Sequence, residues 1–295
     1  MTAPRDLRTA AGAVAIERDV VRAQGPEAVA FLQGQLSQDV AAMALGSSAP
    51  TFLLQPTGKV DAWLRVTRLG DDDVLLDVAA GWGEAVLSRL RRFKLRTKVD
   101  LDRATWCGFA VRGPGSAGTP APADGVRLDA SWPGVESVDV LSQGGVTLEG
   151  IATAAPEALE ALRIECGVPA MGAELTDATI PAEVGQWVIA ASVSFTKGCY
   201  TGQELVARID SRGGNVPRPV RGLRIDGQAV PVGADVLASP EDQAVVGHVT
   251  SSATSAVLGP IALAPVGRSI VVGQPVVVRW DGGQASAVVA ELPFL

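Results

Sequence analysis

The stretch KGCYTGQE at residues 197–204 sets a lysine, a cysteine and two glycines at the start of a predicted helix. Glycine lets the backbone approach a ligand closely, and the first turn of a helix offers unpaired N–H groups to anions. A lysine near a cysteine also favours the thiolate, which attacks electrophiles and binds metals. Lys197 and Cys199 are therefore candidate catalytic residues, with Lys197 positioning an anionic group and Cys199 acting as thiol or cluster ligand.

Each residue of this stretch also fits a structural role when it is considered alone. A single cysteine is often a small buried hydrophobe, and glycines serve turns. Tyr200, the only tyrosine, either packs on a ligand ring or anchors the turn, and we favour the second. Gln203 and Glu204 are expected to cap and begin the helix.

Six further segments of the chain are informative when they are taken together with this stretch. They are FLQGQLSQDV at 31–40, LLQPTGKV at 53–60, RFKLRTKV at 92–99, LRIECG at 162–167, GHVTSS at 247–252 and LGPIAL at 258–263. In this order, and with residues 197–204, they resemble the YgfZ family. These folate-binding relatives of the glycine-cleavage T-protein include a mitochondrial iron–sulfur assembly factor.

The resemblance implies an α+β fold of three domains around a central folate cavity. Two are ferredoxin-like α+β domains and the third is a C-terminal β-barrel, as in aminomethyltransferases. On this basis we expect a discontinuous first domain at residues 1–49 plus 131–216, an inserted domain at 50–130 and a barrel at 217–295. The implied cofactor is tetrahydrofolate or a derivative.

The resemblance also points to residues that bind the cofactor. Glu165 is the candidate for the pterin, because a carboxylate accepts two parallel hydrogen bonds from the ring N3–H and 2-amino group. Asp61 is a third candidate catalytic residue, because it loosely matches a folate-contacting aspartate of T-proteins, although Ala62 stands where those enzymes carry a second acid. Tyr200 and Arg208 complete the candidates, Arg208 because its arginine-rich surroundings could meet an anionic ligand tail.

Composition limits the other possibilities. The chain has 295 residues, 47% of them hydrophobic, and its formal charge of −7 argues against general nucleic-acid affinity. Three cysteines without a CxxC pair and a single histidine predict no disulfide framework and no metal site. Without a signal-like start or an apolar run of about 20 residues, we expect a cytoplasmic protein that does not bind membranes.

Periodicity predicts the main elements. Helices are expected from Pro26 to near Gly46, around Val86–Phe93, from Pro156 to Gly167 and from Gln203 through Ile209. Strands are expected at 51–55, 60–69, 74–78, 219–225, 244–249, 270–279 and 285–291. Residues 113–122 have the composition of a loop.

Three functions compete at this point. The leading hypothesis is a folate-binding accessory protein for the assembly or repair of iron–sulfur proteins, with effects on tRNA-modifying cluster enzymes. Its partners are a reduced folate and iron–sulfur client or assembly proteins. The alternative is a tetrahydrofolate-dependent aminomethyl- or methyltransferase. An RNA-binding module using the basic residues at 89–98 ranks third, because few aromatic residues lie near them.

Overall fold

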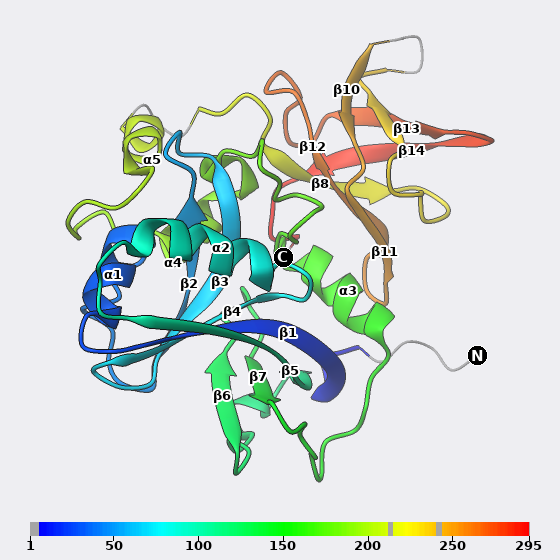
Figure 1. Cartoon of the computed structure of the whole chain (residues 1–295). Coiled ribbons are helices and arrows are strands. Elements are labelled where there is room, and N and C mark those ends of the chain that lie inside the picture. The colour runs from blue at the N-terminus through cyan, green and yellow to red at the C-terminus, as the bar shows by residue number, and fades with distance from the viewer. Residues whose placement is uncertain (1–5, 212–214, 240–243, 295) are drawn as a thin grey trace.

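The computed structural model describes residues 6–211, 215–239 and 244–294. Its strands form two antiparallel seven-stranded sheets, the first at the lower left and the second at the upper right of Figure 1. The first sheet contains, in spatial order, β2 (Ser48–Leu54), β3 (Val60–Arg68), β4 (Asp73–Ala79), β1 (Gly12–Gln24), β5 (Asp100–Arg112), β7 (Ser137–Ser142) and β6 (Gly125–Asp129).

The second sheet contains β10 (Val245–His248), β9 (Asp235–Leu237), β13 (Pro275–Trp280), β14 (Gly283–Ala290), β8 (Val220–Ile225), β12 (Gly259–Pro265) and β11 (Ser251–Ser255). The helices are α1 (Ala28–Gln35), α2 (Gly83–Lys94), α3 (Pro156–Glu165), α4 (Gln186–Ser192), α5 (Gln203–Asp210) and two short 3₁₀ turns, η1 (Ser116–Gly118) and η2 (Pro181–Val184). Among the described residues, no helix combines the length and apolar composition required to cross a membrane.

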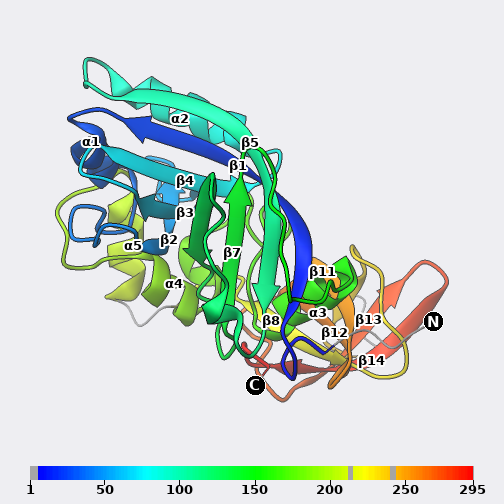
Figure 2. The ribbon, with the colours of Figure 1, turned by 90° about the horizontal axis from the view of Figure 1, so that it is seen from below.

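Helices α1 and α2 cover one face of the first sheet (Figures 1 and 2). Side chains of a strand alternate between the faces, and Leu64 of β3 packs beneath these helices with the fully buried Leu32 and Leu90. The neighbouring Trp63 and Arg65 therefore point to the opposite face, which carries the site described below.

A second core joins that opposite face to the rest of the molecule. Phe52 of β2, Ile164 of α3, Val188 of α4 and Leu263 of β12 share this core. The C-terminal sheet also has a core of its own, which includes the fully buried Val278. The first sheet, the helices α3–α5 and the C-terminal sheet are thus held together by one continuous apolar contact.

The predicted helix from Pro26 to near Gly46 is too long. Helix α1 ends at Gln35, and Leu36 is extended, with φ −102° and ψ 151°. Leu36 forms a bridge with Leu53 of β2, which buries it fully and preserves the apolar spacing without a helix. Tertiary pairing has replaced the last turns that the periodicity predicted.

The other helix predictions are confirmed by α2, α3 and α5, and residues 113–122 form a loop that contains η1. The strand predictions correspond to β2, β3, β4, β8, β10, β13 and β14. Strands β5, β6, β7, β9, β11 and β12 were not predicted from the pattern. In β12 (GPIALAP) two prolines and a glycine look like turn residues, but the strand lies between β8 and β11.

The described strands of the first two predicted domains share one sheet. β1 belongs to the predicted first domain, and it pairs along its whole length with β5 and through residues 18–24 with β4, both of the predicted inserted domain. The division at 49/50, 130/131 and 216/217 stays a prediction.

Candidate functional site

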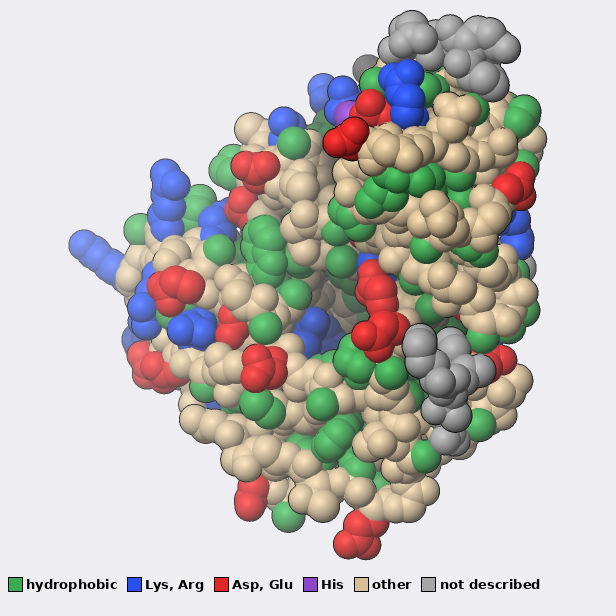
Figure 3. Space-filling model, turned by 90° about the vertical axis from the view of Figure 1, so that its right-hand side faces the viewer, with side chains coloured by type: hydrophobic (Ala, Val, Ile, Leu, Met, Phe, Trp, Pro, Cys, Tyr) green, Lys and Arg blue, Asp and Glu red, His purple; other side chains and the backbone are tan. Residues whose placement is uncertain are grey.

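A cavity of about 300 Å³ lies between the first sheet, α3 and residues 168–171. The indoles of Trp63 and Trp132 and the charged side chains of Arg65, Arg112 and Asp139 are part of its lining. Figure 3 shows the molecule hollowed near the middle of the face drawn, with Lys or Arg side chains inside the hollow. Mostly apolar clefts with a few polar groups are typical small-molecule sites, and about 300 Å³ is at the small end of their range.

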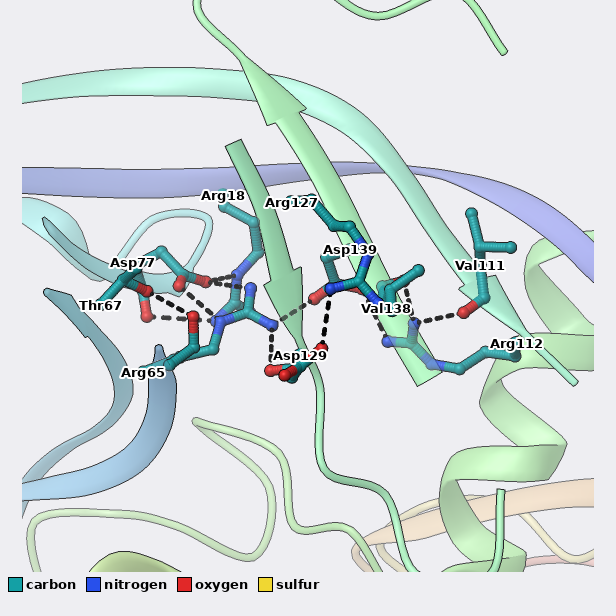
Figure 4. Close-up of polar contacts among 11 residues, drawn as sticks. Arg18, Arg65, Thr67, Asp77, Val111, Arg112, Arg127, Asp129, Val138 and Asp139 are labelled. Atoms are coloured by element: carbon teal, nitrogen blue, oxygen red, sulfur yellow. Dashed lines mark hydrogen bonds and ion pairs between the residues drawn. The ribbon is translucent and has the colours of Figure 1, made fainter. Parts of the chain in front are cut away.

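Charged side chains from five strands form a network beside this cavity (Figure 4). Arg65 of β3 makes two parallel hydrogen bonds to Asp77 of β4, with distances of 2.8 and 2.9 Å. Arg18 of β1 donates to the same carboxylate at 2.8 Å. Asp139 of β7 lies between Arg65 and Arg112 of β5, at 2.9 and 2.8 Å from their nitrogens. Three arginines thus face two aspartates, and one positive charge is in excess.

The arginines keep Asp139 ionised. Burial acts to raise the pKa of Asp139, but Arg112, Arg65 and Arg18 outweigh it and hold the pKa at about 2. Burial also lowers the pKa of Arg112, against the opposing effect of Asp139. Because a guanidinium titrates far above neutral pH, Arg112 stays charged.

Among the described residues, the Nε donor of Arg112 has no acceptor. Its side chain is 3% exposed and lies over the ring of Trp132, 4.3 Å from the centroid. Its Nη1 donates to the carbonyl of Val138 at 2.8 Å, but its Nε has no acceptor among the described residues. A buried donor without an acceptor costs free energy, so this N–H is a candidate to hold an oxygen of a ligand.

Arg163 lines the cavity from α3, but its donors are occupied. It binds both oxygens of Glu160 at 2.8 and 2.6 Å, the carbonyl of Val168 at 2.7 Å and Ser251 of β11 at 2.6 Å. Glu174 lies 3.3 Å away and is itself bonded to Ser251 at 2.7 Å. Arg163 therefore braces α3 against the C-terminal sheet.

The segment 197–204 packs on the C-terminal end of α1. Lys197 Nζ donates to the backbone carbonyls of Gln33, Leu36 and Gln38 at 2.6, 2.7 and 2.8 Å. A cation is favoured there by the helix dipole and by the unpaired carbonyls. Burial lowers the pKa of Lys197 to about 8, and Asp39 acts in the opposite direction. Lys197 thus holds the loop in place, and its predicted role toward an anionic group stays a prediction.

Tyr200 anchors the same loop. It is 9% exposed, packs in the second core, and its ring centroid lies 5.1 Å from Lys197 Nζ. Burial raises the pKa of Tyr200 to about 12. The Tyr200 amide donates to the side chain of Gln203 at 3.2 Å, at the start of α5. These contacts agree with the turn-anchoring interpretation and with the predicted start of the helix.

The cysteines differ in accessibility. Cys166 is fully buried, and burial raises its pKa to about 11, which makes it a poor nucleophile. Cys199 is exposed on the loop before α5, and Cys107 is exposed on β5. Cys199 is therefore the accessible thiol of the 197–204 segment.

Asp61 lies at the start of β3, beside α2. Its carboxylate accepts from Arg89 Nε at 2.9 Å, and Arg89 also donates to the carbonyl of Leu54 at 3.0 Å. The Arg89 guanidinium in turn covers the ring of Phe93, 3.8 Å from its centroid. Asp61 is not part of the lining of the 300 Å³ cavity, and its predicted catalytic role stays a prediction.

Glu165 does not line the 300 Å³ cavity either. It is 5% exposed, ion-paired with Arg8, and lines a separate pocket of about 20 Å³. Arg163, two residues earlier, lines the 300 Å³ cavity, so α3 presents different faces to the two pockets. The predicted role of Glu165 in binding a pterin stays a prediction.

The predicted site residues therefore lie in three places. Lys197, Cys199 and Tyr200 share one loop, with Arg208 exposed on the helix that follows, whereas Asp61 and Glu165 lie elsewhere. The arginine–aspartate network was missed. The sequence feature that could have indicated this network is a charged residue within an apolar strand, such as Arg65 in β3.

A chain of hydrogen bonds connects the cavity to the cysteine loop. Trp63 Nε1 donates to Ser192 Oγ at 2.9 Å, and the Ser192 carbonyl accepts from Ser37 Oγ at 2.7 Å. Ser37 stands between Leu36 and Gln38, whose carbonyls bind Lys197. A cavity tryptophan and the loop of Cys199 are thus joined through buried polar contacts.

Comparisons with known proteins agree with this architecture. Two family models match, the GCVT N-terminal domain at residues 7–127 and the glycine cleavage T-protein C-terminal barrel domain at residues 218–295. A crystal structure of glycine cleavage system aminomethyltransferase T from Bartonella henselae superposes with a TM-score of 0.82 at 22% identity, over 98% of this chain and 88% of that one. The predicted three-domain, T-protein-like α+β fold is confirmed.

Curated relatives carry several names. An aminomethyltransferase of Streptomyces avermitilis is 30% identical over 281 residues, covering 82% of this chain and 74% of its own. The tRNA-modifying protein YgfZ of Photorhabdus laumondii is 28% identical, over 66% of this chain and 65% of its own. The mitochondrial iron-sulfur cluster assembly factor IBA57 homolog of Mycosarcoma maydis is 29% identical, over 66% and 53%. The chain therefore belongs to the family of the glycine cleavage T-protein and YgfZ.

Proposed function

We propose that this protein binds a reduced folate in its central cavity and serves as an accessory factor in the assembly or repair of iron–sulfur proteins. Effects on tRNA-modifying cluster enzymes would follow from that role. The names of the YgfZ and iron-sulfur cluster assembly relatives support the proposal. The observation that carries it is the exposed Cys199 on a loop that Lys197 fixes to the scaffold.

The cavity fits the ring end of a folate. Trp63 and Trp132 offer flat apolar surface for a pterin, and the free Nε of buried Arg112 suits the ring carbonyl. A space of about 300 Å³ accommodates the bicyclic ring, while the longer glutamate tail would extend outwards. In this arrangement Trp63, Arg112 and Trp132 would hold the cofactor, which would supply one-carbon chemistry when bound.

The thiol and the cavity have separate tasks in this proposal. Cys199 does not line the cavity, so a bound folate would act on the cysteine loop through the contacts of Trp63 with Ser192 and Ser37. Cys199 itself would meet a client protein, as thiol or as one ligand of a cluster. A soft thiolate is the usual protein ligand of iron–sulfur clusters.

A matched pair of cysteine variants tests the role of the thiol. In a strain that lacks its own copy of the gene, we expect Cys199→Ser to lose support of a cluster-dependent tRNA-modifying enzyme. Cys107→Ser, the control at another exposed cysteine, should retain it. Equal support of that enzyme by both variants, at equal protein levels, would refute the assignment of Cys199.

An aminomethyltransferase remains the second candidate, because a relative of that name is 30% identical over 82% of this chain. Against it, Asp61 is paired with Arg89, and the adjacent position carries Ala62, which is buried and not acidic. Purified protein, tetrahydrofolate and an aminomethyl donor decide between the two. Formation of methylenetetrahydrofolate would support transfer, and its absence despite tight folate binding would favour the accessory role.

A further inference from the structure

We propose that the end of α2 and the turn after it, residues 91–98, form a docking tip for an acidic protein partner that meets Cys199. This inference rests on the proposed function, because it assigns the surface by which a client reaches the thiol. We call residues 91–98 the basic tip.

The basic tip is an uncompensated local positive charge on an acidic chain. Arg92, Arg96 and Lys98 are exposed, and none of the three has an acidic partner among the described residues. Arg91 donates only to a backbone carbonyl, that of Leu101 at 3.2 Å. Lys94 alone is paired, at 3.8 Å to an exposed aspartate. Since the whole chain carries a formal charge of −7, this surface differs in sign from the net charge of the chain.

Leu95 stands in the middle of these cations. Its side chain is 88% exposed, and its backbone has φ 47° and ψ −116°, a conformation suited to glycine. Strain of this kind is usually offset by packing, but an exposed leucine packs on little within its own chain. An apolar side chain kept in a strained turn, and surrounded by cations, fits a contact with another molecule.

The basic tip contacts the N-terminal end of α1, and the loop that carries Cys199 contacts its C-terminal end. Glu27, just before α1, accepts from the amide of Lys98 at 2.6 Å, while Lys197 binds the carbonyls of Gln33 and Leu36 at the other end. A helix of eight residues is about 12 Å long. Figures 1 and 2 both place α1 at the left-hand edge of the molecule, with the turn after α2 and the loop before α5 beside it. One partner of ordinary size would cover both ends.

Phe195 extends the apolar part of this surface. It is 50% exposed and lies in the same loop as Cys199. Apolar side chains surrounded by charges are a usual composition of protein–protein contacts. A polyanionic nucleic acid would instead be repelled by the acidic remainder of the chain and would require aromatic side chains for base stacking. An acidic protein surface with an apolar contact therefore fits best.

The test measures binding of labelled synthetic peptides to the full chain. The probe is an acidic helical peptide with a stripe of leucines, and the reference is the same peptide with glutamine in place of glutamate. We expect tighter binding of the acidic probe, weakened about fivefold or more by Leu95→Gly and by Arg96→Glu. Arg268→Glu reverses the charge of another exposed arginine, on the C-terminal domain, and should leave peptide binding unchanged.

Two further measurements keep this result separate from the folate proposal. The melting temperature of Leu95→Gly should be equal to or above that of the parent, since glycine relieves the strain of the turn. A loss of peptide binding in this variant is then not caused by unfolding. Tetrahydrofolate affinity should be the same in all three variants, because none of these residues lines the cavity.

Three outcomes would overturn the docking tip. They are equal affinity for the acidic and neutral peptides, unchanged peptide binding by Leu95→Gly and Arg96→Glu, or an effect of Arg96→Glu on a single-stranded RNA probe that exceeds its effect on the peptide. Failure to bind tetrahydrofolate, with peptide binding as expected, would contradict the folate cavity and leave the tip supported.

Discussion

Gly202 and Gly58 lie against each other, with no room for a side chain between them. A Cβ atom on Gly202 would lie 3.2 Å from Cα of Gly58 and 2.5 Å from the carbonyl oxygen of Gln55. A Cβ on Gly58 would lie 3.0 Å from the carbonyl oxygen of Gly202. The 53–60 and 197–204 segments, far apart in the sequence, thus meet through their glycines.

This contact predicts a difference between two glycines of the 197–204 segment. Gly202 has φ 83° and no space for a methyl group, so Gly202→Ala should lower the free energy of unfolding by about 2 kcal/mol or more. Gly198 has an ordinary φ and nothing within 4 Å of its Cβ position, so Gly198→Ala should change it by less than about 0.5 kcal/mol. Denaturant unfolding of both variants checks the pair, and equal losses would contradict the packing.

The lysine of the segment should matter for stability. Lys197→Met removes three hydrogen bonds from a charged donor, and we expect a loss of about 2–4 kcal/mol in unfolding free energy. Lys94→Met is the control, because its pair with Asp100 is long and exposed and should contribute under about 1 kcal/mol. If Lys197→Met unfolds at the same denaturant concentration as Lys94→Met, the capping role of Lys197 is wrong.

Stability should fall in acid because of Asp139. Its pKa is depressed to about 2 in the folded protein, against 3.8 for an unperturbed aspartate, so its contribution is present above about pH 4 and is lost as the pH falls through 2. Asp139→Asn removes this titration and leaves Arg65 and Arg112 without their shared carboxylate, which should cost about 3–5 kcal/mol at neutral pH. Unfolding curves at several pH values measure both effects. A variant as stable as the parent at pH 7 would count against the network.

The thiols should react in a defined order. With iodoacetamide under native conditions, Cys199 and Cys107 should be alkylated, whereas buried Cys166 should react only after unfolding. Peptide mass mapping at successive times follows each site. Protection of Cys199 to the same degree as Cys166 would remove the basis for its proposed role.

The sequence predicted much of the fold because its signals are local. Apolar spacing predicted α2, and Pro156 at the first position of α3 and Gly167 after it predicted both ends of that helix. The end of α1 depends instead on Lys197, which lies about 160 residues later and binds the last carbonyls. Pairing between distant segments cannot be predicted from either segment alone.

The candidate site was predicted only in part for the same reason. The loop of Cys199 could be predicted from the sequence, since its candidate residues are close together along the chain. The cavity network draws on Arg18, Arg65, Asp77, Arg112 and Asp139, which come together only when five strands pair. Glu165, which the motif predicts to bind a pterin, is ion-paired with Arg8 and does not line this cavity, and its role stays a prediction.

The central claim is that a reduced folate binds among Trp63, Arg112 and Trp132, and that Cys199 acts elsewhere. Calorimetric titration with tetrahydrofolate tests it most directly, with the parent protein, Trp132→Ala, Cys199→Ala and Glu165→Gln. We predict that Trp132→Ala weakens binding about tenfold, through lost stacking on the ring, while Cys199→Ala and Glu165→Gln bind like the parent. Unchanged affinity in Trp132→Ala together with a loss in Glu165→Gln would place the folate at Glu165 and contradict the account.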